Sequence, residues 1–95
     1  MIRIAIVGCT GKLGRTVIMN AMRSKDIEVS YAIARKGNQF VGQTISEFLG
    51  NGLDLPIIDD IEAAKDCDIF IDCTNAESFM SDSYYKYKKM GKALV

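Results

Sequence analysis

Three glycines spaced three residues apart, directly after an apolar run, constrain the fold of this chain more than any other feature. Gly8, Gly11 and Gly14 form the pattern G-x-x-G-x-x-G and follow the β-branched run of residues 2–7. A short, nearly continuous apolar run predicts a strand covered on both faces, as in a parallel sheet. Apolar residues then recur at helical spacing over residues 12–24, which predicts an amphipathic helix. The glycines therefore connect a strand to a helix.

A glycine-rich turn of this kind has a structural and a ligand-binding interpretation. Glycines let the chain turn sharply, let the backbone approach a diphosphate, and let the helix pack closely on the sheet. The first free N–H groups of the helix, at its positive dipole end, then bind the anion. The strand before and the helix after are the context that this motif requires, so we interpret the loop as a dinucleotide-binding site. Thr10, Lys12 and Arg15 could each reach a phosphate, with turn capping and solvation as alternatives.

The rest of the chain alternates between strand and helix patterns. Further strands are predicted over residues 28–34, 55–58, 68–73 and, as the beginning of a fifth, 93–95; helices are predicted over residues 45–49, 61–65 (capped by Asp59 or Asp60) and 75–90, with Met80, Tyr84 and Tyr87 facing the core. Such alternation predicts a parallel sheet with right-handed crossovers. We therefore expect one α/β domain over residues 1–95, a Rossmann-like open parallel sheet with helices on both faces, truncated near strand five.

The charge balance excludes one class of partner. Lys plus Arg equals Asp plus Glu at 12 each, so the net charge is zero. A domain that neutralises nucleic-acid phosphates would show a basic excess or stripe. No apolar run reaches the 18 or so residues of a membrane span, and the first residues lack the length of a secretory signal. We expect a cytoplasmic protein with neither nucleic acid nor membrane as a partner.

Histidine is absent, and the three cysteines, Cys9, Cys67 and Cys73, contain no C-x-x-C pair. This leaves no zinc pattern and no disulfide framework, and it removes the commonest metal ligand and general acid or base. We expect no metal site and no catalytic residue. Cys9 and Cys73 both fall at predicted strand ends and are expected to lie close together, either as small buried apolar residues or as a redox pair.

The residues after the predicted second strand bear on which dinucleotide is bound. An NAD site usually places Asp or Glu about 20 residues beyond the glycines, to bind the ribose 2′-OH; here that position is Ala34. Arg35 and Lys36 follow, and two cations suit the 2′-phosphate of NADP, which arginine can bind bidentately. The sequence predicts a preference for NADPH over NADH, with ordinary loop cations as the alternative.

Polar residues also follow the predicted fourth strand. In open α/β sheets, ligands lie over the carboxyl ends of strands, where Asp72, Cys73 and Thr74 fall. We expect Cys73 and Thr74 to border the nicotinamide half of a cofactor. Asp72 is interpreted as a structural acceptor for N–H groups of the loop and not as a catalytic acid.

Four segments together resemble the N-terminal domain of the dihydrodipicolinate reductase (4-hydroxy-tetrahydrodipicolinate reductase) family of lysine and diaminopimelate biosynthesis. IAIVGCTGKLGRTV is similar to the family's V-x-G-x-x-G-x-[ML]-G-[RK], AIARKG to the segment that ends its second strand, DIFIDCTNAES to its D-[FV]-[TS]-x-P element, and MGKALV to its H-G-K-x-x-[VI] run. The resemblance covers essentially the whole chain. It departs locally at Cys73, Asn75 and Ala76, where Phe, Ser and Pro are common.

The resemblance implies an oxidoreductase that transfers hydride from NADPH, with NADH possible, to the cyclic product of an aldol condensation. It implies that residues 8–13 wrap the pyrophosphate, that Arg35 meets the 2′-phosphate and that Thr74 lies near the nicotinamide ribose. Many members have an acid where this chain has Ala34, so use of NADH is in doubt. The complete set of expected cofactor-binding residues is Gly8, Cys9, Thr10, Gly11, Lys12, Leu13, Gly14, Arg35, Lys36, Cys73 and Thr74.

Members of the family continue with a Gly-Thr-Thr-Gly loop and a substrate domain, neither of which occurs in these 95 residues. We therefore expect the substrate and catalytic domain to be absent and the chain alone to be catalytically incompetent. An open sheet edge invites pairing with another chain, so a homo-oligomer is possible. Two other functions remain open: a stand-alone NAD(P)-sensing regulatory domain, and the first half of another NADP oxidoreductase, such as a homoserine or semialdehyde dehydrogenase.

Overall fold

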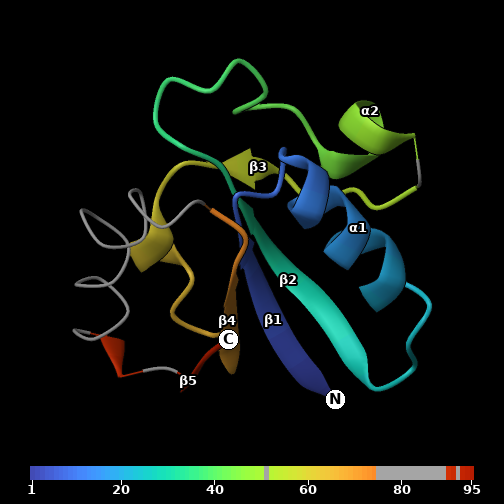
Figure 1. The fold of residues 1–95 in the computed structure, drawn as a ribbon, viewed down its shortest axis with the longest axis vertical. Coiled ribbons are helices and arrows are strands. Elements are labelled where there is room, and N and C mark those ends of the chain that lie inside the picture. Colours follow the sequence, from blue (N-terminus) through green and yellow to red (C-terminus); the bar gives the residue numbers. More distant parts are fainter. Residues whose placement is uncertain (51, 75–89, 92) are drawn as a thin grey trace.

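The computed structural model describes residues 1–50, 52–74, 90–91 and 93–95 of the chain. Its strands pair in parallel and form one sheet in the order β3-β2-β1-β4-β5 (Figure 1). The strands are β1 (Ile2–Val7), β2 (Ile27–Ile33), β3 (Ile57–Ile58), β4 (Ile69–Asp72) and β5 (Ala93–Leu94). The helices are α1 (Lys12–Ala21), α2 (Ile45–Leu49) and the 3-10 helix η1 (Ile61–Ala63). The predicted α/β class with an open, Rossmann-like parallel sheet is confirmed.

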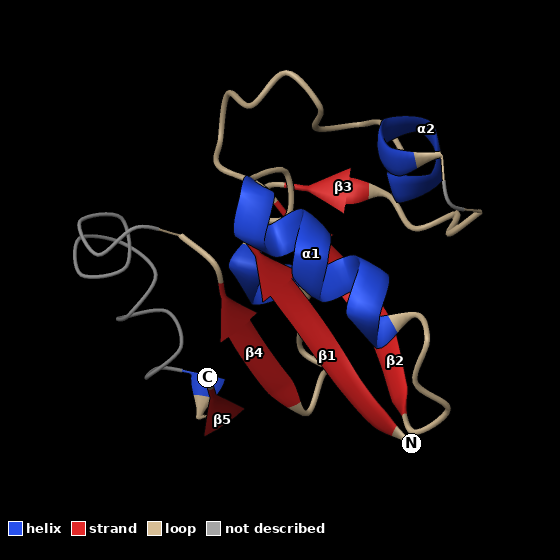
Figure 2. Cartoon of the chain, turned by 45° about the vertical axis from the view of Figure 1, so that its right-hand side comes forward, coloured by secondary structure: helices blue, strands red, loops and turns tan. Residues whose placement is uncertain are grey.

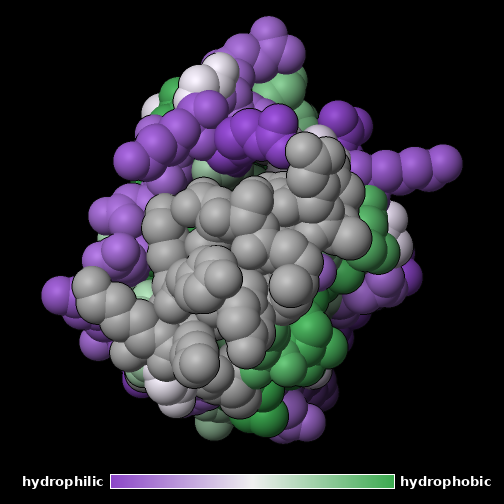
Figure 3. Space-filling view, turned by 60° about the vertical axis from the view of Figure 1, so that its left-hand side comes forward, coloured by the Kyte–Doolittle hydropathy of each residue, from purple (hydrophilic) through white to green (hydrophobic). Residues whose placement is uncertain are grey.

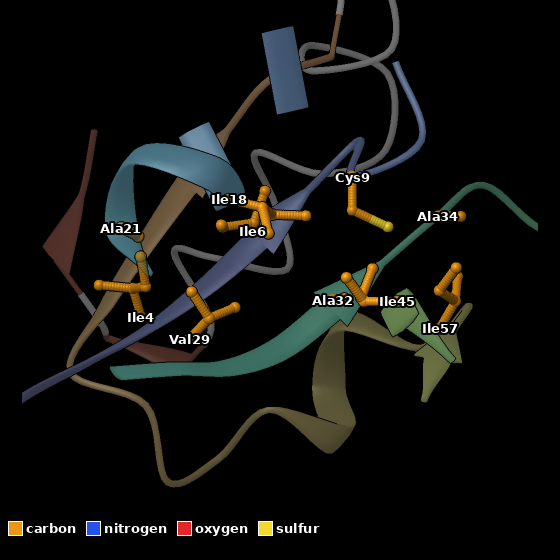
Figure 4. Packing of buried hydrophobic residues seen from close by; sticks show 10 residues of the cluster. All are labelled: Ile4, Ile6, Cys9, Ile18, Ala21, Val29, Ala32, Ala34, Ile45 and Ile57. Carbon is orange, nitrogen blue, oxygen red and sulfur yellow. The ribbon is translucent and has the colours of Figure 1, made fainter. Parts of the chain in front are cut away.

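Strand β1 is buried on both faces, as its nearly continuous apolar sequence predicts. Ile4 and Ile6 pack with Ile18 of α1, the helix that crosses the sheet in front of β1 and β2 (Figures 2 and 4). Ala5 and Val7 belong to a second buried cluster, which residues of η1 and of the turn after it complete. Because successive side chains of a strand point to opposite faces, β1 contributes to both cores and anchors the loop that follows it.

Helix α1 is shorter than the helical pattern suggested. The predicted helix reached residue 24, whereas α1 ends at Ala21 with Met22 as its C-cap. The N–H of Ser24 donates to the Ala21 carbonyl at 3.0 Å, which tightens the last turn. The chain then enters β2 at Ile27, one residue before the predicted start.

The segment between β2 and β4 differs most from its predicted form. The strand predicted over residues 55–58 contains only Ile57–Ile58, because Pro56 forms an isolated antiparallel bridge with Thr44 instead of pairing with β2. The helix predicted over residues 61–65 is the three-residue 3-10 helix η1. Asp60, one of the two predicted caps, accepts a hydrogen bond from the Glu62 N–H at 3.0 Å. Helix α2 matches its predicted range.

The C-terminal part of the chain is described only at its end. The helix predicted from residue 75, with its stripe of Met80, Tyr84 and Tyr87, lies outside the described residues apart from Met90. Gly91, the predicted end of that helix, has a φ of 66°, which is the left-handed conformation of a C-terminal cap. Strand β5 pairs with β4, which confirms the predicted beginning of a fifth strand. No helix in the described part of the chain is both long and apolar enough to cross a membrane.

The order of the strands brings three loops to one edge of the sheet. Val7, the last residue of β1, is paired with Ile33 on one side and with Asp72 on the other. Because the three strands are parallel, the segments that follow them leave the sheet side by side. The chain runs outward from β1 in one direction through β2 and β3 and in the other through β4 and β5. Such a switch point is where open α/β sheets bind ligands.

Candidate functional site

The loop after β1 is held between the loops after β2 and β4. The N–H groups of Gly8 and Cys9 both donate to the Ile33 carbonyl, at 2.8 and 3.2 Å. The N–H of Cys73 donates to the Val7 carbonyl at 2.8 Å. These bonds bring the sequence-predicted residues together at the carboxyl edge of the sheet: Gly8, Cys9, Thr10, Gly11, Lys12, Leu13 and Gly14 from the first loop, Arg35 and Lys36 from the second, and Cys73 and Thr74 from the third.

Two of the three glycines are required by the fold itself. Gly8 has a φ of 82°, and a Cβ there would lie 3.1 Å from the Cys73 carbonyl carbon and from Thr74 Cγ2. A Cβ on Gly14 would overlap the Gly8 carbonyl oxygen and lie 2.8 Å from Cys9 Cα. Only glycine readily adopts the positive φ of residue 8, and at both positions a side chain would come too close to its neighbours. These two residues let the loop pass β4 and let α1 pack directly on the turn.

Gly11 has no such internal requirement. Its φ of −77° suits any residue, and a Cβ there would lie 3.5 Å from the Gly8 carbonyl oxygen, an ordinary contact. Gly11 is also exposed. A glycine that the chain does not need for its own packing leaves room for a group outside the chain to approach the backbone.

The N-terminus of α1 presents unused hydrogen-bond donors. Gly11 is the N-cap and offers no side chain, and the first turn contains no acid. Among the described residues, the N–H groups of Lys12, Leu13 and Gly14 have no acceptor. The N-terminus of α2 in the same chain is closed by a full capping box instead. Free N–H groups at the positive end of a helix dipole suit a phosphate.

The turn after β2 carries the two predicted cations. The side chain of Ala34 is buried, and its N–H donates to the Ile58 carbonyl at 2.8 Å. Arg35 and Lys36 are exposed. Hydrophilic side chains gather at the top of the face in Figure 3, the end at which the segment between β2 and α2 lies in Figure 1. The position expected for an acid in an NAD site thus belongs to the core, and the residues next to it are cationic.

Thr10 is held by two partners that the sequence did not suggest. Its hydroxyl accepts a hydrogen bond from Asn38 Nδ2 at 3.0 Å, and its carbonyl accepts one from Arg15 Nε at 3.1 Å. The Arg15 guanidinium also lies 4.8 Å from the centre of the Phe48 ring. Arg15 therefore helps to hold the glycine loop. Nothing local in the sequence indicates that Asn38 has a partner 28 positions away.

The loop after β4 confirms the structural interpretation of Asp72. Its Oδ1 accepts a hydrogen bond from the Thr74 N–H at 2.8 Å and a very short one from the Thr74 hydroxyl. The carboxylate thereby fixes the turn that carries Thr74 past Gly8.

The cysteines at this edge behave as small packing residues. Cys9 is fully buried and points into the cluster around Ala32 and Ile45 (Figure 4). Burial raises the pKa of its thiol to about 12. Burial, and then the charge of Asp72, also raises the pKa of Cys73, which packs against the same cluster. The predicted proximity is confirmed, and the raised pKa values favour the thiol form of both residues.

The raised pKa values disfavour the reactive thiolate at both cysteines, and the buried Cys9 would meet a ligand through its backbone. Among the described residues, no group of three His, Cys, Asp or Glu side chains is placed to hold a metal ion.

Comparison with known proteins identifies similar sequences. The family model for the N-terminus of dihydrodipicolinate reductase matches residues 2–95. The 4-hydroxy-tetrahydrodipicolinate reductase of Anaplasma marginale (strain St. Maries) is 34% identical over 79 residues, which cover 82% of this chain and 31% of that protein. The enzyme of the same name from Ehrlichia canis (strain Jake) is 34% identical over 80 residues, 83% of this chain and 30% of that protein. The chain thus spans about a third of these relatives.

Solved structures share the fold at lower identity. An aspartate semialdehyde dehydrogenase from Candida albicans, crystallised with NADP, superposes on 99% of this chain and 28% of its own, with a TM-score of 0.78 and 13% identity. A dipicolinate-bound dihydrodipicolinate reductase from Paenisporosarcina sp. TG-14 covers 95% of this chain and 33% of its own, with a TM-score of 0.60 and 19% identity. At these identities the likeness concerns the fold alone.

Proposed function

The chain belongs to the dihydrodipicolinate reductase family, whose N-terminal part its residues 2–95 match, and we propose that it is the NADPH-binding domain of a 4-hydroxy-tetrahydrodipicolinate reductase. Both relatives at 34% identity carry that enzyme's name. The reduced nicotinamide supplies the hydride when it is bound. The residues of this chain bind the dinucleotide and orient it for a reduction in lysine and diaminopimelate biosynthesis.

One observation is the main support for the dinucleotide site. Helix α1 follows Gly11, an exposed glycine that the fold does not need, and the first three N–H groups of the helix have no acceptor among the described residues. A pyrophosphate would lie against Gly11, with the N–H groups of Lys12 and Leu13 as donors. Gly8 and Gly14 support this site indirectly, because they permit the turn and the close packing of the helix. The residues present therefore fit the group.

The cations after β2 support a preference for the phosphorylated dinucleotide. Arg35 and Lys36 are exposed in the loop after β2. A hydrogen bond from Asn38 to Thr10 joins that loop to the glycine loop. An arginine fork matches a phosphate bidentately. The side chain of Ala34 offers no acceptor for the 2′-OH of NADH. We therefore assign Arg35, with Lys36 beside it, to the 2′-phosphate of NADPH, while NADH remains the weaker ligand.

The loop after β4 would border the other end of the cofactor. Thr74 lies next to Gly8 at the switch point between β1 and β4, and Asp72 holds it there. The backbone of Cys73 continues this border. Both residues would contact the nicotinamide half of the cofactor and thereby exclude water from one side of it.

Two other functions are less well supported. A stand-alone sensor would not account for the match to a reductase family over residues 2–95. The likeness to a semialdehyde dehydrogenase concerns only the fold, and many functions share this fold. Since these 95 residues correspond to a third of each relative, substrate binding would depend on a further domain, and the 95 residues alone would show no turnover. A cytoplasmic location remains a prediction, and it suits reduced cysteines. Pairing of two copies of the chain through a sheet edge is also a prediction, and light scattering can test it.

Titration of the chain with NADPH and NADH by calorimetry tests the cofactor assignment. Arg35→Ala is expected to raise the Kd for NADPH by about 10- to 100-fold, because hydrogen bonds to charged groups contribute about 1.5–3 kcal/mol each. The Kd for NADH should change little. Lys25→Ala is the matched control, since it removes an exposed cation at the opposite edge of the sheet. Equal losses for both cofactors, or equal effects of both variants, would contradict the assignment.

A further inference from the structure

Asn38 connects the two loops to which the phosphates of the cofactor are assigned. Its side-chain carbonyl accepts from the Phe40 N–H at 2.9 Å, which leaves Nδ2 as the donor to Thr10 Oγ1 at 3.0 Å. The backbone N–H of Asn38 donates to the Arg35 carbonyl at 3.0 Å. One residue therefore closes the turn that carries the cations and binds that turn to the glycine loop.

A second set of contacts closes the connection into a ring. The ring of Phe40 packs on the ring of Phe48, with centroids 4.5 Å apart. The Arg15 guanidinium lies over Phe48 and donates to the Thr10 carbonyl. Thr10 is thus held through its hydroxyl from the side of β2 and through its carbonyl from α1. In this ring, the Asn38 amide makes the direct link between the cation turn and the glycine loop.

Among the described residues, the cation turn is held by backbone hydrogen bonds and by the Asn38 side chain, while the side chains of Arg35 and Lys36 make no hydrogen bond. Arg35 and Lys36 are exposed, and Gly37 has a φ of 86° with no atom within 4 Å of the position of a Cβ. We therefore expect the turn to sample more positions when the Asn38 side chain is removed. Two anionic groups of one ligand bind most tightly when their sites are already at the right separation, because little ordering is then needed on binding.

We propose that Asn38 is a positioning residue that couples the 2′-phosphate site to the pyrophosphate site and thereby sets the preference for NADPH over NADH. This inference rests on the proposed function, because it presumes that the glycine loop and the cation turn bind one dinucleotide. Asn38 itself need not touch the cofactor. Its effect is transmitted through Thr10 on one side and Arg35 on the other.

Calorimetric titration of Asn38→Ala with NADPH and NADH tests the coupling. The Kd for NADPH is expected to rise about tenfold, while that for NADH rises less than about threefold, so that the ratio of the two constants falls. Gln39→Ala is the matched control, because Gln39 is the neighbouring exposed amide without a hydrogen bond among the described residues. It should leave both constants unchanged. Thermal unfolding of each variant separates loss of fold from loss of selectivity.

A double-mutant cycle supplies a readout that a purely structural role would not move. If Asn38 acts by placing Arg35, the double variant Asn38→Ala, Arg35→Ala should bind NADPH no more weakly than Arg35→Ala alone. Additive losses, or an equal loss of both cofactors in Asn38→Ala, would overturn the coupling while leaving the dinucleotide site intact. Equal affinity of the unmodified chain for NADPH and NADH would overturn the coupling as well. Failure to bind either cofactor would overturn the proposed function and the coupling together.

Discussion

Replacing Gly14 by alanine tests whether the glycine loop is shaped by contact between backbones. The added Cβ would lie 2.8 Å from Cys9 Cα and 3.0 Å from the Cys9 carbonyl carbon, and it would overlap the Gly8 carbonyl oxygen. Ordinary Cβ contacts begin at 3.4 Å. All three neighbours are backbone atoms of a turn that is itself bonded to the Ile33 carbonyl. The turn cannot rotate away as a side chain would, so α1 has to move.

Two opposing effects set the size of the loss. Alanine is a better helix former than glycine by about 1 kcal/mol. Overpacking costs about 1–3 kcal/mol, and more when no side chain can yield. Moving α1 also loosens Ile18 and Ala21, which pack against the sheet from that helix. We expect the cost of the clash to exceed the gain in helix propensity. The free energy of unfolding should fall by about 2 kcal/mol, and Tm by about 8–16 °C for a domain of this size.

Urea and thermal unfolding, followed by circular dichroism at 222 nm, measure this loss. Gly11→Ala is the matched control, because its Cβ would lie 3.5 Å from the nearest atom and its φ of −77° suits alanine. That variant should unfold within about 1 kcal/mol of the unmodified chain, since the weaker helix cap and the lower entropy of the unfolded chain oppose each other. The reasoning is refuted if Gly14→Ala is as stable as the unmodified chain, or if both variants lose the same free energy of unfolding.

The capping box of α2 and the buried thiols give further predictions. Thr44→Ala removes the hydroxyl that accepts from the Glu47 N–H at 3.1 Å and should lower the free energy of unfolding by about 1 kcal/mol, whereas Thr44→Ser should keep most of it; equal urea midpoints for the two variants would contradict this. The Cys9 thiol, with a pKa raised from 9.0 to about 12 in the folded chain, stays protonated while the unfolded thiol ionises, so the free energy of unfolding should fall from pH 9 toward 12. This fall should be shallower in Cys9→Ala; parallel curves would count against it. Buried Cys9 and Cys67 should not react with Ellman's reagent at pH 8 until urea is added, and rapid reaction of the folded chain would show that they are accessible.

The local patterns of the sequence were sufficient to predict most strands of the sheet. Residues 2–7 are a strand as predicted, because a β-branched, nearly continuous apolar run suits burial on both faces. Helix α2 was also predicted at its observed bounds, where Thr44 and Glu47 form the capping box. In each case the signal lies within a few residues of the element that it specifies.

Predictions failed where distant segments compete for the same backbone groups. The strand expected over residues 55–58 is shortened because the Leu55 carbonyl accepts from Ile45 and the Ile57 N–H donates to Gln43. For Arg15 the sequence left open a phosphate contact or simple solvation, and the structure adds contacts with Phe48 and the Thr10 carbonyl. Phe48 lies in α2, and no local pattern indicates that this helix packs beside Arg15.

The sequence by itself determined the class of the fold and the position of the glycine loop, since periodicity and glycine content act over a few neighbouring residues. Its resemblance to the dihydrodipicolinate reductase family was carried by four short segments. Only the tertiary structure distinguished the roles of the three glycines: Gly8 and Gly14 avoid clashes with backbone, whereas a Cβ on Gly11 would make only an ordinary contact. It also joined Asn38 to Thr10 across 28 positions of the chain. The reason is physical, because a close contact or a hydrogen bond between loops depends on the parallel pairing of β1 with β2 and β4, which places their ends side by side.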